Sequence, residues 1–326
     1  MRNTEDGGEA ILEAFRALRV DYVISSPGSE WPSLWEAFAR QKAKNTTGPV
    51  YLDCGHEILA VSIAAGYTKL TGRMQVVLLH AGAGLLQGSM AIFGARLTET
   101  PMLVLSGESQ SFGEGEFDPG PQWYRSLNVV GGPQRLVEPV VKIALQTPSV
   151  STLYQSIVRA GELAQRSPQG PTYLCISMES MIESWSRPTR TPYVPAPPKL
   201  QPATGDIARV AEQLSHANCP FIFAESVGGN EDAFRALAEL AELLAIPVID
   251  APGAAYPTFP NVTVFISVSM QRLTSMRSIS LCWSMAWPRN ANRESRSTLP
   301  TVSSPRRSAN SSWPIRPGMN STRATW

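Results

Sequence analysis

Runs of aliphatic residues typical of buried strands alternate with helical segments up to about residue 177, and this alternation constrains the fold more than any other feature. The units are roughly 30 residues long, as in strand–helix–strand repeats. Such repeats predict a parallel sheet covered by helices on both faces, an α/β fold. The expected strands are 21–25, 49–52, 75–79, 101–106 and 171–176, and the expected helices include 8–20, 34–38, 88–97 and 150–165.

The chain of 326 residues has room for two domains. Six prolines between positions 187 and 202 predict a stiff linker. A second helix–strand–helix–strand series follows this linker, with helices expected at 204–216 and 231–244. We therefore expect a first domain at 1–186, a linker at 187–203, an incomplete second α/β domain at 204–260 and an irregular tail at 261–326.

Composition favours a cytoplasmic globular protein. Hydrophobic residues make up 43% and charged residues 17%, and no apolar run approaches the ~20 residues that span a membrane. The first six residues do not resemble a secretory signal. The four cysteines lie far apart without metal-ligand spacing, so we expect reduced, buried thiols and no metal site built from them.

The amino-acid composition of the tail differs from that of the rest of the chain. Residues 261–326 carry nine arginines and one acidic residue, Glu294, together with 14 serines and four of the eight tryptophans. We back-translated residues 265–286 and read the codons with a shift of one base. Permitted codons can then spell a sequence that ends in EVDLALLVDG, a pattern typical of a buried strand. We therefore interpret the tail as out of frame, the result of a frameshift near codon 261. Nucleic-acid binding through its arginines is the less favoured alternative.

One carboxylate opens an otherwise apolar helix that ends on a glycine. The segment runs from His56 and Glu57 through Ala60 and Ala64 to Gly72. An acid among apolar neighbours such as Ile58, Leu59 and Val61 is poorly solvated, which raises its pKa and suits it to proton sharing at neutral pH. The plainer alternative is a helix-entry glutamate favoured by the helix dipole.

This segment resembles the pyrimidine-binding domain of thiamine diphosphate (ThDP) enzymes, which carries a HE-x-x-A-x-x-x-A-x-GY-x-x-x-TG run. The resemblance covers residues 7 to about 260 and implies that Glu57 hydrogen-bonds to the cofactor's aminopyrimidine ring and activates the cofactor. It also implies a carbon–carbon lyase or ligase acting on a 2-oxo acid, by decarboxylation or by acetolactate-type carboligation. A homo-oligomer, a dimer or a tetramer, is implied for the complete protein.

Two further segments resemble benzoylformate decarboxylase: the turn Pro27–Gly28–Ser29 and the run from His80 to Gln87. The resemblance implies that Ser29 and His80 bind the substrate carboxylate and shuttle protons. Gln87 stands where the family usually has asparagine. The other interpretations are that Ser29 caps the next helix and that His80 is a core residue. The predicted cofactor-binding residues are Pro27, Gly28, Glu57, Gly84 and Gln87.

The family's anchor for the diphosphate and Mg²⁺, a GDG segment followed by an asparagine pair, does not occur in the sequence; Gly205–Asp206–Ile207 comes nearest. We therefore expect a truncated chain that retains ThDP and Mg²⁺ poorly and does not act alone. The alternative function is a non-catalytic binding module that docks on an intact ThDP enzyme.

Overall fold

The computed structural model describes residues 5–108, 131–147, 149–187, 194–198, 201–225 and 227–250. The predicted tail, 261–326, and the last ten residues of the predicted second domain lie outside these ranges. No described helix is both long and apolar enough to cross a membrane.

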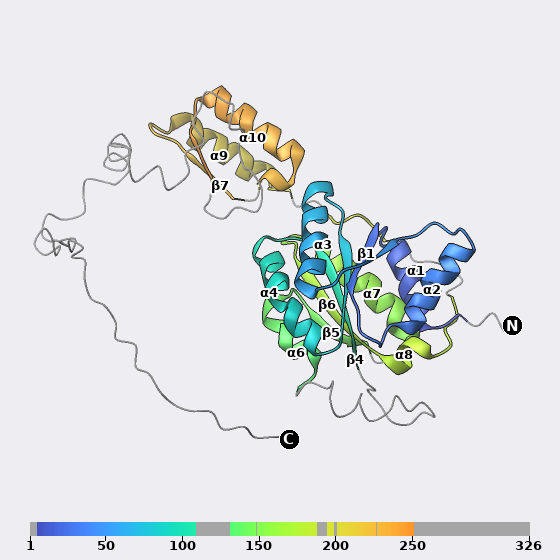
Figure 1. Ribbon diagram of the computed structural model, residues 1–326. Helices are drawn as coiled ribbons and strands as arrows, with labels where there is room; N and C mark the ends of the chain where they lie inside the picture. The colour runs from blue at the N-terminus through green and yellow to red at the C-terminus, as the bar shows by residue number, and fades with distance from the viewer. Residues whose placement is uncertain are drawn as a thin grey trace, which may run out of the picture. The chain divides into compact units, whose positions relative to one another are not determined.

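Six parallel strands form one sheet, in the order β2-β1-β3-β4-β6-β5 (Figure 1). This confirms the predicted α/β class. The strands are β1 (Tyr22–Ser26), β2 (Val50–Asp53), β3 (Gln75–Leu79), β4 (Met102–Glu108), β5 (Ala144–Thr147) and β6 (Pro171–Ser177).

Helices cover both faces of this sheet (Figure 1). One face packs on α1 (Gly7–Ala17), α2 (Pro32–Ala43), α7 (Val150–Gln165) and α8 (Met178–Ile182). The other packs on α3 (Glu57–Thr71), α4 (Ala83–Leu97) and α6 (Pro133–Val137), which the 3₁₀ turn η1 (Glu138–Val140) follows. The strands alternate between the two cores: Val76 and Leu78 face the first, and Val77 and Leu79 face the second. Burial on both faces explains why β3 is buried along its whole length and apolar from Val76 to Leu79.

The helix after β3 starts earlier than expected. We predicted a glycine-rich turn followed by a helix at 88–97, but α4 begins at Ala83. Gly82, with φ 55°, turns the chain directly into the helix, a conformation that glycine adopts without strain. Gly84 and Gly88 then lie inside the helix, and their low helix propensity misled the prediction. The short elements α6, η1, β5 and α8 were also not predicted.

A second, smaller sheet contains two parallel strands, β7 (Ile222–Ala224) and β8 (Val248–Asp250). It accompanies α9 (Thr204–His216), the 3₁₀ turn η2 (Val227–Gly229) and α10 (Glu231–Leu244). Its buried cluster is small: Ala224, Ala241 and Val248. Cys219, in this part, is exposed, which corrects the expectation of buried thiols, whereas Cys54 and Cys175 are buried as expected.

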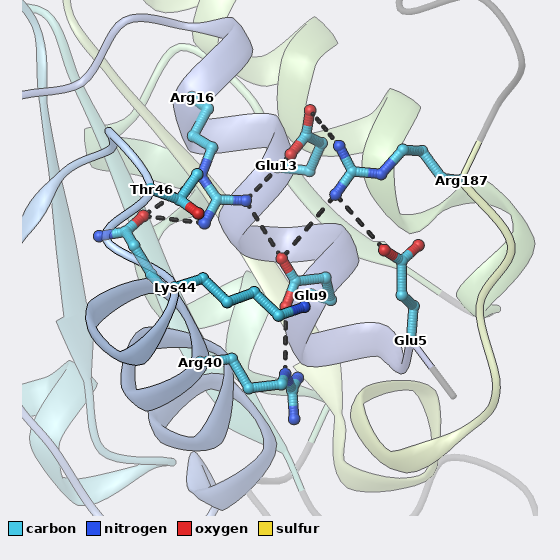
Figure 2. Close-up of a pocket in the computed structure, with 9 residues that line it drawn as sticks. Glu5, Glu9, Glu13, Arg16, Arg40, Lys44, Thr46 and Arg187 are labelled. Carbon is cyan, nitrogen blue, oxygen red and sulfur yellow. Dashed lines mark hydrogen bonds and ion pairs between the residues drawn. The ribbon is translucent and has the colours of Figure 1, made fainter. Parts of the chain in front are cut away.

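The start of α1 and the segment after α8 meet through backbone pairing and a cluster of charges. Asp6 and Ser184 form an antiparallel bridge. Beside it, Glu9 of α1 contacts Arg16 at 3.1 Å and Arg40 at 3.3 Å, and Arg187 bonds Glu13 at 3.1 Å (Figure 2). The charges surround a pocket of about 310 Å³ that is lined by Glu5, Glu9, Glu13, Arg16, Arg40, Gln41, Lys44, Thr46 and Arg187. This ionic cluster joins α1, α2 and the start of the linker.

We expect Glu9→Gln to lower the free energy of unfolding by roughly 1–3 kcal/mol, because Glu9 is 10% exposed and its removal leaves cationic neighbours undercompensated. Glu162→Gln is the matched control, since the one ion pair of Glu162 among the described residues is with Arg159 of α7, whose side chain is 55% exposed. Its cost should stay below roughly 0.5 kcal/mol. Urea unfolding followed by circular dichroism measures both, and equal losses would contradict a structural role for the cluster.

Candidate functional site

The predicted site residues gather at one edge of the six-stranded sheet. β1 lies between β2 and β3, with Ser25 opposite Asp53 and Ser26 opposite Leu79, so the three carboxyl ends are level. The turn 27–30 follows β1, Glu57 follows the loop after β2, and His80 follows β3. Because the chain passes to opposite sides of β1 to form β2 and β3, this edge is a topological switch point, where open α/β sheets bind ligands.

Glu57 is the first residue of α3, and His56 caps the helix. The His56 Nδ1 accepts the backbone N–H of Ile58 at 3.2 Å. Gly84 lies directly beside this acid: a Cβ built at Gly84 would be 3.2 Å from Glu57 Oε1 and 2.8 Å from the Cβ of His80. The structure therefore brings together Glu57, His80 and Gly84, three of the predicted residues.

The expected apolar burial of Glu57 is not found. Its side chain is half-buried, and both Ile58 and Leu59 are exposed, whereas Ala60 and Val61 face the core. The helix turns successive side chains by about 100°, so neighbours in sequence do not share one environment. Glu57 lies at a helix N-terminus, where the helix dipole favours an acid. This position is therefore consistent both with a cofactor-activating acid and with a helix-entry glutamate.

His80 is bound by a residue that the sequence analysis missed. Its Nδ1 lies 2.9 Å from Oε2 of Glu30, whose side chain is 0% exposed while that of His80 is 29% exposed. The pKa of His80 is raised, first by the hydrogen bond to Glu30 and then by the charges of Glu30 and Glu57, while burial opposes the rise. His80 is thus neither a core residue nor a free side chain.

Ser29 is exposed and lies in the turn before α2. Helix α2 has Trp31 as its N-cap residue and no side-chain capping hydrogen bond, so the interpretation of Ser29 as a helix cap is wrong. Pro27 and Gly28 precede it in the same turn. A Cβ at Gly28 would lie 1.7 Å from His80 Nδ1, so the Gly28 backbone packs against the Glu30–His80 pair.

Gln87 contacts a second missed residue, His56, with 3.2 Å between the Gln87 Nε2 and His56 Nε2 atoms. Since the Nδ1 of His56 accepts a hydrogen bond, the neutral ring carries its proton on Nε2. An N–H there needs an acceptor, so we assign the amide of Gln87 the reverse orientation, with its oxygen toward His56. His56 stood within the quoted motif, but no spacing rule gave it a role.

Glu30 is 50 residues from His80, so the sequence pattern could not predict that the two residues form a pair.

Metal-ligating side chains do not cluster among the described residues: no group of three or more His, Cys, Asp or Glu could hold an ion. The pocket of the ionic cluster beside α1 shares no residue with this site. Its acids and arginines pair with one another.

Residues 5–131 match the family described as thiamine pyrophosphate enzyme, N-terminal TPP binding domain. This stretch is similar to the N-terminal TPP binding domain of the thiamine pyrophosphate enzymes. Among curated relatives, the acetolactate synthase of Bacillus subtilis (strain 168) is 22% identical over 250 residues, which are 76% of this chain and 41% of that protein. The benzoylformate decarboxylase of Pseudomonas aeruginosa is 26% identical over 226 residues, 63% of this chain and 38% of that protein.

Solved structures of this family share the fold. The thiamine diphosphate-dependent 4-hydroxybenzoylformate decarboxylase of Rhodococcus jostii RHA1 superposes with a TM-score of 0.60 at 22% identity, covering 78% of this chain and 46% of that chain. The chain thus spans about two fifths of the length of the curated relatives it matches. The resemblance of residues 7 to about 260 to thiamine diphosphate enzymes is confirmed at the level of family and fold.

The raised pKa of His80 makes stability depend on pH with a definite sign. The folded state binds the proton more tightly than the unfolded state, whose histidines titrate near 6.5. The stabilising contribution is therefore fully present below about pH 6.5 and is lost as the pH rises through the folded-state pKa.

We expect wild-type protein to lose stability relative to His80→Gln over that window, as measured by urea unfolding at a series of pH values. His216→Gln, which removes an exposed ring on α9, is the control. A wild-type advantage that grows with pH would show that the sign is wrong.

Proposed function

We propose that this chain provides the aminopyrimidine side of a ThDP site, with Glu57 as the cofactor-activating acid. The complete protein would be a carbon–carbon lyase or ligase that acts on a 2-oxo acid. The observation that carries the proposal is the meeting of Glu57 and His80 across Gly84 at the sheet's switch point.

The residues present fit the aminopyrimidine end of the cofactor. Glu57 is half-buried at the mouth of α3, and the missing side chain at Gly84 leaves its Oε1 approachable. Thiamine diphosphate, when bound, supplies the carbon nucleophile that attacks a 2-oxo acid. Glu57 would hold a proton against a ring nitrogen, and the backbone of Pro27, Gly28 and Gly84 and the amide of Gln87 would line the ring's surroundings.

His80 and Ser29 are the proposed substrate residues. Both follow carboxyl ends of neighbouring strands, and Ser29 is exposed to an incoming molecule. A positively charged His80 attracts a substrate carboxylate, and its ring exchanges protons near neutral pH. We assign no residue of this chain to Mg²⁺ or to the diphosphate, because the sequence has no GDG segment.

Ligand-observed NMR of the full chain with millimolar ThDP tests the role of Glu57. We expect saturation transfer to protons of the aminopyrimidine ring, and its loss in Glu57→Gln, because the ring contact depends on that acid. Glu36→Gln, an exposed acid on α2, is the matched control and should leave the transfer unchanged. Transfer of equal strength to Glu57→Gln, or none to wild type, would contradict the proposal.

An apolar stripe on α4 supports oligomerisation. Leu86, Met90, Phe93 and Leu97 recur at helical spacing and are 54%, 72%, 42% and 67% exposed. Leu59 and Leu70 of the adjacent α3 are exposed as well. An exposed apolar helix face of this kind marks a protein–protein contact. We propose that a second copy of the chain covers it; the alternative is docking on another, intact ThDP enzyme.

Light scattering after size-exclusion chromatography tests the stripe. We expect wild type to elute as a dimer or a larger assembly, and the double variant M90E/L97E as a monomer, because two buried charges without partners prevent association. Leu243→Glu, at an exposed leucine of α10, is the control. A monomeric wild type would reject the second copy, and co-elution with a complete ThDP enzyme would then favour the alternative.

A further inference from the structure

The Glu30–His80 pair is built into the fold. Glu30 uses both side-chain oxygens on consecutive residues: Oε1 accepts the backbone N–H of Ala81 at 2.8 Å, and Oε2 contacts the Nδ1 of His80 at 2.9 Å. Next to it, Trp31, which is fully buried, donates its indole N–H to the carbonyl of Leu79 at 3.3 Å. The turn after β1 is therefore fixed to the end of β3 through three consecutive residues of that end.

Two glycines leave the space in which Glu30 lies. A Cβ at Gly107 of β4 would be 2.0 Å from Cγ of Glu30, and one at Gly28 would be 2.3 Å from its Oε2. Backbone on both sides thus confines a side chain that has no exposed surface. The close backbone and two hydrogen bonds hold its oxygens toward His80 and Ala81.

The pairing decides which ring nitrogen of His80 is free. A carboxylate only accepts hydrogen bonds, so the His80 Nδ1 must carry a proton. Neutral His80 then has an unprotonated Nε2, and charged His80 has an N–H there. Among the described residues, the ionisable groups acting on the ring are Glu30, from the turn before α2, and Glu57, from α3.

We propose that Glu30 is a positioning residue that keeps the proton on Nδ1 of His80 and leaves Nε2 as the ring nitrogen that exchanges protons with the substrate. Nε2 takes a proton from water and passes it to a substrate atom, while Nδ1 keeps its proton on Glu30. The substrate part of this inference rests on the proposed function; the tautomer of His80 does not.

NMR of the full chain with ¹⁵N-labelled histidine reads the tautomer directly. The chain has three histidines, so one variant, His80→Gln, assigns the His80 signal. In wild type we expect neutral His80 to carry its proton on Nδ1 and to titrate above the ordinary histidine range. A neutral His80 with its proton on Nε2 would overturn the proposal without any further variant.

Glu30→Gln supplies the sharper comparison. The glutamine oxygen can satisfy the N–H of Ala81, and the amide NH₂ then faces His80, so Nδ1 must become an acceptor. We expect the neutral tautomer to switch to Nε2–H and the pKa of His80 to fall. The signals of His56 and His216 should keep their positions, which also reports that the variant is folded. Glu36→Gln should change none of the three.

An unchanged His80 tautomer and titration in folded Glu30→Gln would overturn the proposal. A switched tautomer together with absent aminopyrimidine contact in the ThDP experiment would instead reject the proposed function and leave the Glu30–His80 pair standing. If Glu30→Gln does not fold, the wild-type tautomer decides.

Discussion

The parallel pairing of β1 with β2 on one side and β3 on the other is the constraint on which the site depends. Ser25 opposite Asp53 and Ser26 opposite Leu79 set three strand ends at one level. The segments that leave these ends carry Glu30, Glu57 and His80. A slip of one residue would turn every side chain of a strand to the opposite face of the sheet, so the packing of the two cores fixes the register.

Two polar clusters perform different tasks in the same domain. The ionic cluster joins α1, α2 and the segment after α8, and its three glutamates pair with its three arginines: Glu5, Glu9, Glu13, Arg16, Arg40 and Arg187. The pair of Glu30 and His80 has one completely buried member and one member that is still reached by solvent. A buried acceptor behind a partly exposed imidazole is an arrangement suited to proton exchange, which a balanced surface network does not offer.

The sequence predicted the strands and the main helices well because a parallel sheet buried on both faces imposes long apolar runs. It did worse where propensity and tertiary context disagree. Gly84 and Gly88 reduce helix propensity, yet α4 runs through them because its neighbours pack closely there: a Cβ at Gly88 would lie 2.8 Å from Leu79. Strand β5 was missed because its residues Leu145 and Gln146 are exposed at the sheet edge and lack a buried pattern.

The sequence by itself determined the family resemblance, the α/β class and the position of Glu57 at the start of a helix, since these follow from local pattern and spacing. Only the tertiary structure decided which side chains meet. Glu30 and His80 are 50 residues apart in the sequence but in contact in the structure. Gly28 packs against His80 and Gly107 packs against Glu30, so both glycines are required by segments that are distant in the sequence. The half-exposed state of Glu57 was likewise decided by packing, because burial is a property of neighbours in space and not of neighbours along the chain.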